Sequence, residues 1–488
     1  MSDQSARWGA LVPPDPPAGR AAPRWLLHED EAVLVVDKPA FVSIRRDEGP
    51  EVTSLLPRVE RWLEARGDRR GVEAIDPLPL HASGLVILTR GRQRRPLRAR
   101  YRWWLTREGR ERRERVERKE PPKGREAHAP HIHRWRVDLD GAGRRLRVEA
   151  PLPEAMRRWL EGEDDALPDD LDAALARALA RREALAALPD TDAYRLVHGA
   201  GDDLPGVELD RYRDHAVLAL RSEEAVAREA ALLDAVLRLG PAGVYLKRRP
   251  RQANVVVDTR NDELAPKAPA RGEAAPSPLV VHERGTPLVT RLDDGLSTGV
   301  FLDQRDARAW LAGEAAGKRL LNLFCYHGAF TVAAVVGGVA ESVSVDASGA
   351  ALERARENLD AVSADPEHHR LVRADALRYV ERGREPYDLI VLDPPSFATT
   401  KKSTFRAARD YPALAAAALG RLAPGGWMLA CTNHRGIVAS KFRRQLEAAL
   451  ERTGIAVAEL YELEAPIDFP APPGRDPHLK RIIVRRAP

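Results

Sequence analysis

The stretch that decides the fold is residues 319–331, RLLNLFCYHGAFT, which is followed at once by the apolar run Val332–Val336. Arg319–Leu323 predicts a buried strand, and Gly328 marks the turn into a helix that continues through the apolar run. A strand that turns into a helix in this way exposes backbone N–H groups at its carboxyl end, where open α/β sheets bind ligands. The G-x-G-x-x-G spacing is absent from this stretch, so a pyrophosphate cradle is not indicated.

Three further apolar runs each end in a carboxylate. They are Ser342–Val345 before Asp346, Arg370–Arg373 before Asp375, and Tyr387–Leu392 before Asp393-Pro394-Pro395. A single acid after a strand is often only a helix cap. Strand ends that present Gly, Asp, Asp and Asp-Pro-Pro in this order predict instead one ligand site on a doubly wound parallel α/β sheet. There Asp346 can accept hydrogen bonds from both hydroxyls of a ribose, and Asp375 can accept one from an adenine amino group.

These motifs resemble those of class I S-adenosylmethionine-dependent methyltransferases. More narrowly, Leu321–Thr331, Gly299–Arg305 and Asp393–Phe397 resemble the large-subunit (23S) rRNA methyltransferase family, which has a guanine-N7 branch and a cytosine-C5 branch. The resemblance implies S-adenosylmethionine as cofactor, a Rossmann-like methyltransferase domain at 279–488 and a small α/β domain at 191–278 before it. The implied cofactor-binding residues are Gln304, Arg305, Phe324, Tyr326, Gly328, Asp346, Asp375 and Ala376.

The methyl acceptor depends on residues 427–436, WMLACTNHRG. Carbon 5 of a pyrimidine needs a covalent cysteine adduct before it can react, whereas guanine N7 carries a lone pair and needs only alignment with the methyl group. In the cytosine-C5 branch the nucleophile falls at the position of Asn433. Cys431 lies two residues earlier, on the same face of a strand, so it stays open as an alternative nucleophile.

The string around Asn433 resembles the guanine-N7 branch more closely, as do residues 244–252, VYLKRRPRQ. The leading interpretation is therefore methylation of guanine N7 in 23S rRNA, with Asp393, Pro394, Pro395 and Asn433 at the reaction site. Phe397 can stack on a flipped base or pack in the core. The alternatives are cytosine-C5 methylation through Cys431 and a noncatalytic RNA-binding ribosome-assembly factor.

The N-terminal part resembles a second RNA-modifying family. Leu26–Asp30, Val33–Ala40, Ser83–Thr89 and Ala150–Pro153 resemble segments of RluA-type pseudouridine synthases. That family has Arg-Leu-Asp four residues before Ser-Gly-Leu, where this chain has Pro-Leu-Pro; Asp76 lies three residues too early. The resemblance implies a degenerate α+β pseudouridine-synthase-like domain at 25–161 that binds RNA without isomerising it.

Residues 91–126 form a basic insertion with fifteen Lys or Arg and six Glu, and with Tyr101, Trp103 and Trp104 among them. Arginines for phosphates and aromatic rings for unpaired bases favour an RNA surface; the alternative is a solvated, salt-bridged helix. The residues predicted to bind RNA are Arg92, Arg94, Arg95 and Arg98, with Lys247, Arg248 and Arg249 as a second patch and Phe397 near the base.

The composition of the whole chain agrees with an intracellular RNA enzyme. The length of 488 residues suggests about three domains at ~150 residues each. The two cysteines exclude a disulfide scaffold and a four-cysteine zinc site, so we expect no metal and a cytoplasmic location. Residues 1–24 predict a flexible tail without an export signal, and 162–190 an amphipathic connecting helix. Residues 320–340 are apolar, but their turn residues favour a strand and a helix over a membrane span.

Overall fold

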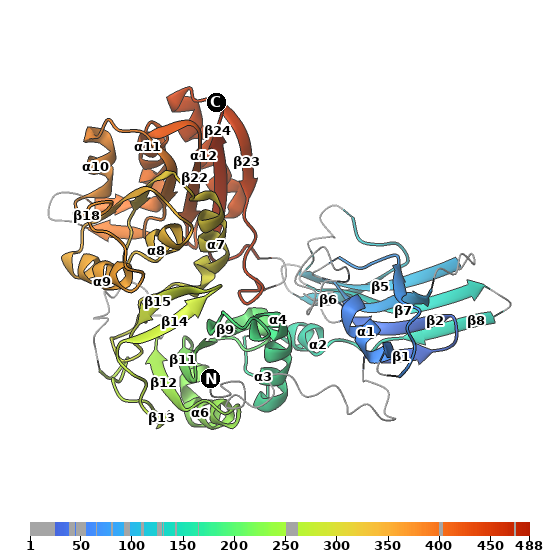
Figure 1. Cartoon of the computed structure of the whole chain (residues 1–488). Coiled ribbons are helices and arrows are strands. Elements are labelled where there is room, and N and C mark those ends of the chain that lie inside the picture. The colour runs from blue at the N-terminus through green and yellow to red at the C-terminus, as the bar shows by residue number, and fades with distance from the viewer. Residues whose placement is uncertain are drawn as a thin grey trace.

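The computed structural model describes residues 25–38, 44, 55–64, 66–79, 82–91, 98–108, 112–123, 129, 131–141, 144–163, 165–249, 262–399, 404–472 and 475–488. Residues 1–24 and the predicted RNA-binding residues Arg92, Arg94 and Arg95 lie outside these ranges. The described chain forms three larger sheets, which follow one another along the sequence (Figure 1).

The C-terminal sheet has seven strands in the order β18-β17-β16-β19-β22-β24-β23. The strands are β16 (Arg319–Leu323), β17 (Glu341–Asp346), β18 (His369–Arg373), β19 (Tyr387–Leu392), β22 (Leu422–Thr432), β23 (Val457–Glu462) and β24 (Lys480–Arg486). The first five are parallel, and β24 is antiparallel to both of its neighbours. Because the chain starts in the middle of the sheet and winds outward in both directions, the predicted doubly wound sheet is confirmed.

Helices cover both faces of this sheet. They are α7 (Arg305–Glu314), α8 (Ala329–Val336), α9 (Gly349–Asp360), α10 (Ala376–Arg382), α11 (Ala407–Leu419) and α12 (Ala439–Thr453). On one face, Leu414 of α11 and Phe442 of α12 pack in the same cluster as Leu323 and Ile390 of the strands. On the other face, α7 and α8 pack against Leu320 and the neighbouring strands. The alternate residues of each strand therefore serve two separate cores, which explains its nearly continuous apolar sequence.

The middle part contains a five-stranded sheet in the order β13-β12-β11-β10-β9. Its elements are β9 (Ala193–His198), η4 (Gly199–Asp202), β10 (Val207–Tyr212), β11 (His215–Leu220), α5 (Glu223–Ala227), α6 (Glu229–Arg238), β12 (Gly243–Arg248) and β13 (Arg271–Gly272). A separate hairpin, β14 (Leu279–Glu283) and β15 (Thr286–Thr290), lies between this sheet and the seven-stranded one (Figure 1). Apolar residues of the hairpin share one core with Tyr245 of β12 and Val332 of α8, so the two sheets are joined by packed side chains.

The N-terminal part is an eight-stranded sheet in the order β1-β2-β4-β7-β5-β6, with β3 beside β4 and β8 beside β7. The elements are β1 (Leu26–Glu29), β2 (Val33–Lys38), α1 (Leu55–Glu64), β3 (Val72–Ile75), β4 (Ser83–Arg90), β5 (Arg98–Glu108), β6 (Arg113–Arg118), β7 (Ile132–Gly141) and β8 (Arg144–Glu149). The basic insertion thus forms the antiparallel strands β5 and β6, and the alternative of a solvated helix is wrong. Trp103 is 3% exposed and belongs to the core, so it is not available to stack on RNA bases.

Two short helices, α3 (Leu171–Ala180) and α4 (Glu183–Ala186), replace the single connecting helix expected at 162–190. A further short helix, α2 (Glu154–Glu161), precedes them. Asp170 caps α3 by accepting a hydrogen bond from the Ala173 N–H, which is why the helix starts there. The break before α4 places Arg182 inside the molecule, where its guanidinium forms an ion pair with Asp202. Among the residues that the structure describes, no helix combines the length and the apolar character needed to cross a bilayer.

Candidate active site

A cavity of about 540 Å³ lies at the carboxyl ends of the parallel strands of the seven-stranded sheet. This volume is within the range of small-molecule and cofactor sites. Ten of the predicted site residues line it: Gln304, Phe324, Tyr326, Asp346, Asp375, Ala376, Asp393, Pro394, Pro395 and Asn433. The residues that the sequence places at four strand ends therefore meet around one cavity.

The loop after β16 forms one wall of the cavity. Phe324 and Tyr326 have positive φ angles of 61° and 50°, and Gly328 has a φ of 75°. A Cβ atom on Gly328 would lie 3.1 Å from the Cβ of Ala355, so the glycine serves both the turn and the close approach of α9. The loop thereby directs the Tyr326 N–H at Asp346, whose Oδ2 accepts it at 3.0 Å.

The two carboxylates on the neighbouring strand ends are held by backbone donors. Asp346 also accepts the Ser348 N–H through Oδ1 at 2.9 Å, and each of its oxygens has a second lone pair for a ligand hydroxyl. Asp375 is the N-cap of α10, where its Oδ1 accepts the Arg378 N–H at 3.1 Å. Asp375 is therefore a helix cap and a cavity residue at once.

Asp393 lies on the opposite wall, at the end of β19. Gln304 Nε2 donates to Asp393 Oδ2 at 2.9 Å, while Gln304 Oε1 is buried with no partner among the described residues. Burial raises the pKa of Asp393 to about 6, helped by the negative charge of Asp303 and opposed by the Gln304 hydrogen bond. Its pKa therefore lies well above that of an ordinary aspartate.

Asn433 and Cys431 differ in accessibility although they are two residues apart and both lie close to the residues around Asp393. Asn433 follows β22, lines the cavity, and accepts a hydrogen bond from Ser396 Oγ at 2.8 Å. Cys431 lies inside β22, is fully buried and packs with Leu429 and Ile483. Burial raises the pKa of the Cys431 thiol well above its usual range. Cys325 lines the cavity at the end of β16, and its thiol pKa is also raised by burial.

The comparisons with known proteins agree with this geometry. A family model described as S-adenosylmethionine-dependent methyltransferase matches residues 216–485. The chain belongs to this family. It is 33% identical to ribosomal RNA large subunit methyltransferase I of Erwinia tasmaniensis over 318 residues, which cover 63% of this chain and 78% of that protein. With the Escherichia coli enzyme of the same name, the identity is 33% over 300 residues, 61% of this chain and 74% of that one.

A solved structure shows the same relationship in three dimensions. The crystal structure of SMU.776 complexed with SAH is 30% identical, with a TM-score of 0.58 over 64% of this chain and 80% of that one. Together with the family match, it supports S-adenosylmethionine as the cofactor of this methyltransferase. The residues fit the cofactor. The loop that turns at Gly328 lies beside Asp346, and the Asp346 carboxylate has lone pairs left for the ribose hydroxyls.

Four predicted residues of the methyltransferase do not lie where the sequence placed them. Arg305 does not line the cavity, since both terminal nitrogens of its guanidinium bind Asp468 at 2.7 and 2.8 Å. Lys247 is 1% exposed and donates to the carbonyls of Leu292 and Gly295, so it cannot reach RNA at the surface. The other two are engaged by the protein itself: the Arg248 side chain, which is 30% exposed, by Glu229, and Arg249 by the carbonyl of Leu296.

Phe397 is 57% exposed, which excludes the alternative that it packs in the core. It begins the hairpin of β20 (Phe397–Thr399) and β21 (Thr404–Arg406), which the sequence analysis missed. Phe301, Phe405 and Arg409 also line the cavity and were not among the predicted site residues. The string around Phe301 was available as a signal because it belongs to the family motif at 299–305, whereas nothing local points to Phe405 or Arg409.

Proposed function

We propose that this methyltransferase transfers the methyl group of S-adenosylmethionine to guanine N7 in 23S rRNA. A ribosomal RNA substrate is supported by the relatives named as large-subunit rRNA methyltransferases. The observation that supports this acceptor is that Asn433 lines the cavity, whereas the Cys431 thiol is fully buried behind it, beside Gln304 and Asp393, with its pKa raised well above the usual range. A covalent route through carbon 5 of cytosine needs an accessible thiolate there.

The cofactor occupies the part of the cavity beside β16, β17 and β18 in this proposal. Asp346 accepts from the ribose hydroxyls, and Asp375 and Ala376 lie beside the adenine. Phe324, Tyr326 and the Gly328 turn shape the wall nearest the rest of the molecule. S-adenosylmethionine supplies an already activated methyl group, so the protein has to align the acceptor and exclude water.

The target base occupies the part of the cavity beside Asp393, Pro394, Pro395 and Asn433. Two prolines fix the backbone after β19, and the Ser396 hydroxyl orients the Asn433 side chain. The ionised Asp393 carboxylate can accept hydrogen bonds from the N–H groups of guanine. Phe397, exposed just after the two prolines, offers a face on which a flipped base can stack.

We further propose that the N-terminal domain is a degenerate pseudouridine-synthase-like domain that serves as an RNA-binding arm.

Single-turnover methyl transfer to 23S rRNA, with the product nucleoside identified by mass, tests this proposal. Guanine-N7 transfer predicts 7-methylguanosine as product and nearly full activity in Cys431→Ser. Asn433→Ala should lose about a hundredfold in rate, because a misaligned acceptor loses the benefit of orientation. Abolished transfer in Cys431→Ser with 5-methylcytidine as the wild-type product would establish the cytosine route instead. Cofactor binding without any transfer to rRNA would favour an assembly factor.

A further inference from the structure

A basic groove of about 820 Å³ lies on the N-terminal sheet, formed by β5, β7, β8 and the residue after β6. Seven cations line it against two carboxylates, Asp138 and Asp140. The cations are Lys119 and six arginines: Arg98, Arg100, Arg102, Arg136, Arg145 and Arg147. We call this surface the arginine groove. Only Arg98 belongs to the set that the sequence predicted to bind RNA.

The cations lie on one face because of strand register. Arg100 pairs with Asp138 across β5 and β7, and Asp138 pairs with Arg147 across β7 and β8. The alternate residues of the same strands, such as Tyr101, Val137 and Val148, pack in the core on the opposite face. Side chains two residues apart on a strand share a face, so Arg98 and Arg100 face solvent together, and Arg102 lies partly exposed beside them.

The acids of the groove are already paired, and some of its cations are not. Asp138 Oδ1 and Oδ2 accept hydrogen bonds from Arg147 Nε at 2.7 Å and from Arg136 Nε at 3.0 Å. These contacts hold the pKa of Asp138 below its usual value against the opposing effect of desolvation. The exposed side chains of Arg98, Arg100 and Lys119 make no hydrogen bond or ion pair with any residue that the structure describes.

An ordinary solvated surface does not explain the excess of seven cations over two carboxylates in the groove. The whole chain has nearly equal numbers of basic and acidic residues, 78 and 73, so an average surface would be balanced. An array of guanidinium groups is suited to phosphates, which it binds through paired N–H donors. Beside the groove, on the same face of β5 as Arg102, Trp104 stacks on Trp135 with ring centroids 4.7 Å apart. The Arg115 guanidinium also lies 4.4 Å over the Trp104 ring. The relatives named as ribosomal RNA methyltransferases favour RNA over an acidic protein as the occupant of the groove.

We propose that the arginine groove binds the phosphate backbone of the RNA substrate, apart from the methyl-transfer cavity. This inference rests on the proposed rRNA substrate and adds a docking surface to it. The groove holds RNA through charge and the cavity selects the base, which is the usual division between phosphate contacts and base contacts. Loss of the groove therefore weakens RNA binding without changing the cofactor site.

The test measures RNA affinity against salt for the full chain, with a 23S rRNA fragment as ligand. The variant is Arg98→Gln with Arg100→Gln; both side chains are exposed and unpaired, so the fold should not change. The matched control is Arg444→Gln with Arg452→Gln, which removes the same charge from exposed positions of α12. If each groove arginine binds one phosphate of a single strand, the slope of log K against log salt should fall by roughly 1.4.

The expected result is weaker binding at low salt and a flatter slope for the groove variant only, with calorimetric affinity for S-adenosylmethionine unchanged. A slope equal to that of the wild type, or an equal loss of RNA affinity in the α12 control, would overturn the proposal that the groove binds RNA. Wild-type protein that does not bind the rRNA fragment even at low salt would instead contradict the rRNA substrate itself. The failure of the groove and the failure of the proposed function therefore give different results.

Discussion

The cavity of the methyltransferase domain and the arginine groove of the N-terminal domain hold their charged groups in opposite ways. In the cavity, two of the acids have partners from their own protein: Asp346 a backbone N–H on each oxygen, and Asp393 the Gln304 amide. In the groove, Arg98 and Arg100 extend into solvent without partners among the described residues. Preorganised groups suit recognition of one ligand geometry, whereas free exposed cations suit a flexible polyanion.

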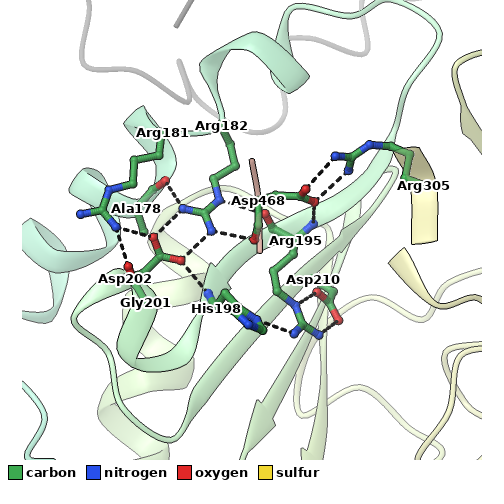
Figure 2. A network of polar contacts seen from close by, with 10 residues as sticks. All are labelled: Ala178, Arg181, Arg182, Arg195, His198, Gly201, Asp202, Asp210, Arg305 and Asp468. Carbon is green, nitrogen blue, oxygen red and sulfur yellow. Dashed lines mark hydrogen bonds and ion pairs between the residues drawn. The ribbon is translucent and has the colours of Figure 1, made fainter. Parts of the chain in front are cut away.

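The ion pairs of the two regions differ in burial: those around Asp468 in the methyltransferase part are buried, whereas those of Asp138 in the arginine groove are partly exposed. The Asp468 side chain is fully buried and binds the Arg305 guanidinium with both oxygens, while its Oδ2 also accepts the Arg195 N–H at 3.0 Å (Figure 2). Its carbonyl accepts from Arg182 at 2.9 Å. Asp468 comes from the segment between β23 and β24, so it joins that segment to α7, to β9 and to the start of α4. Since Gln304 directly precedes Arg305, this cluster also fixes the residue that holds Asp393.

The first prediction concerns this buried cluster. Asp468→Ala leaves both terminal nitrogens of the buried Arg305 guanidinium without their carboxylate and only the 3.4 Å contact of its Nε with Asp306. Removing one partner of a buried ion pair costs about 3–5 kcal/mol of the free energy of unfolding. Asp138→Ala in the groove is the matched control, since its exposed pairs should contribute at most ~1 kcal/mol. Urea unfolding of the two variants measures the difference. Equal losses would show that burial does not separate the two regions.

The second prediction concerns the cofactor wall. Asp346→Ala removes two charge-assisted hydrogen bonds to the ribose, each worth ~1.5–3 kcal/mol, so calorimetry should show at least tenfold weaker affinity for S-adenosylmethionine. Asp360→Ala, an exposed acid at the end of α9, is the control. The salt dependence of RNA binding should stay as in the wild type. Unchanged cofactor affinity would remove Asp346 from the site.

The contrast between the two regions also explains what could be predicted from the sequence. Strand ends such as Asp346 and Asp393 were predictable, because parallel strands place the residues after them at one edge of the sheet. The pairing of Arg305 with Asp468 was not, because the two lie 163 positions apart and no local pattern links them. Arg305 and Lys247 look like binding residues in a motif, yet burial gives both a structural role.

The basic insertion shows that the sequence could have excluded the alternative of a solvated helix. The Glu residues between arginines suggested an alternative helix, but Arg98, Arg100 and Arg102 alternate with Ala99, Tyr101 and Trp103. This period of two predicts a strand with one basic and one apolar face, as β5 has. The hairpin of β20 and β21 carries no comparable pattern, since each of its strands has only three residues.

The last and smallest effect expected is the pH dependence that Asp393 gives to the cavity. Its pKa is raised from 3.8 to about 6, so its proton is bound more tightly in the folded than in the unfolded protein. Between these two pH values the folded state holds more protons, and the contribution of this group to the free energy of unfolding falls as pH rises. The single-turnover rate should show the opposite trend, a severalfold rise through about pH 6, because the carboxylate accepts hydrogen bonds from the base better than the neutral acid does.

The control is Asp393→Asn, whose side chain carries no charge at any of these pH values. The single-turnover rate of this variant should be flat in this range. The free energy of unfolding of the wild type should fall with rising pH relative to that of the variant, and this difference in slope should disappear below about pH 4. A wild-type profile identical to that of Asp393→Asn, in both rate and urea unfolding between pH 4 and 7, would show that Asp393 does not titrate in the folded enzyme.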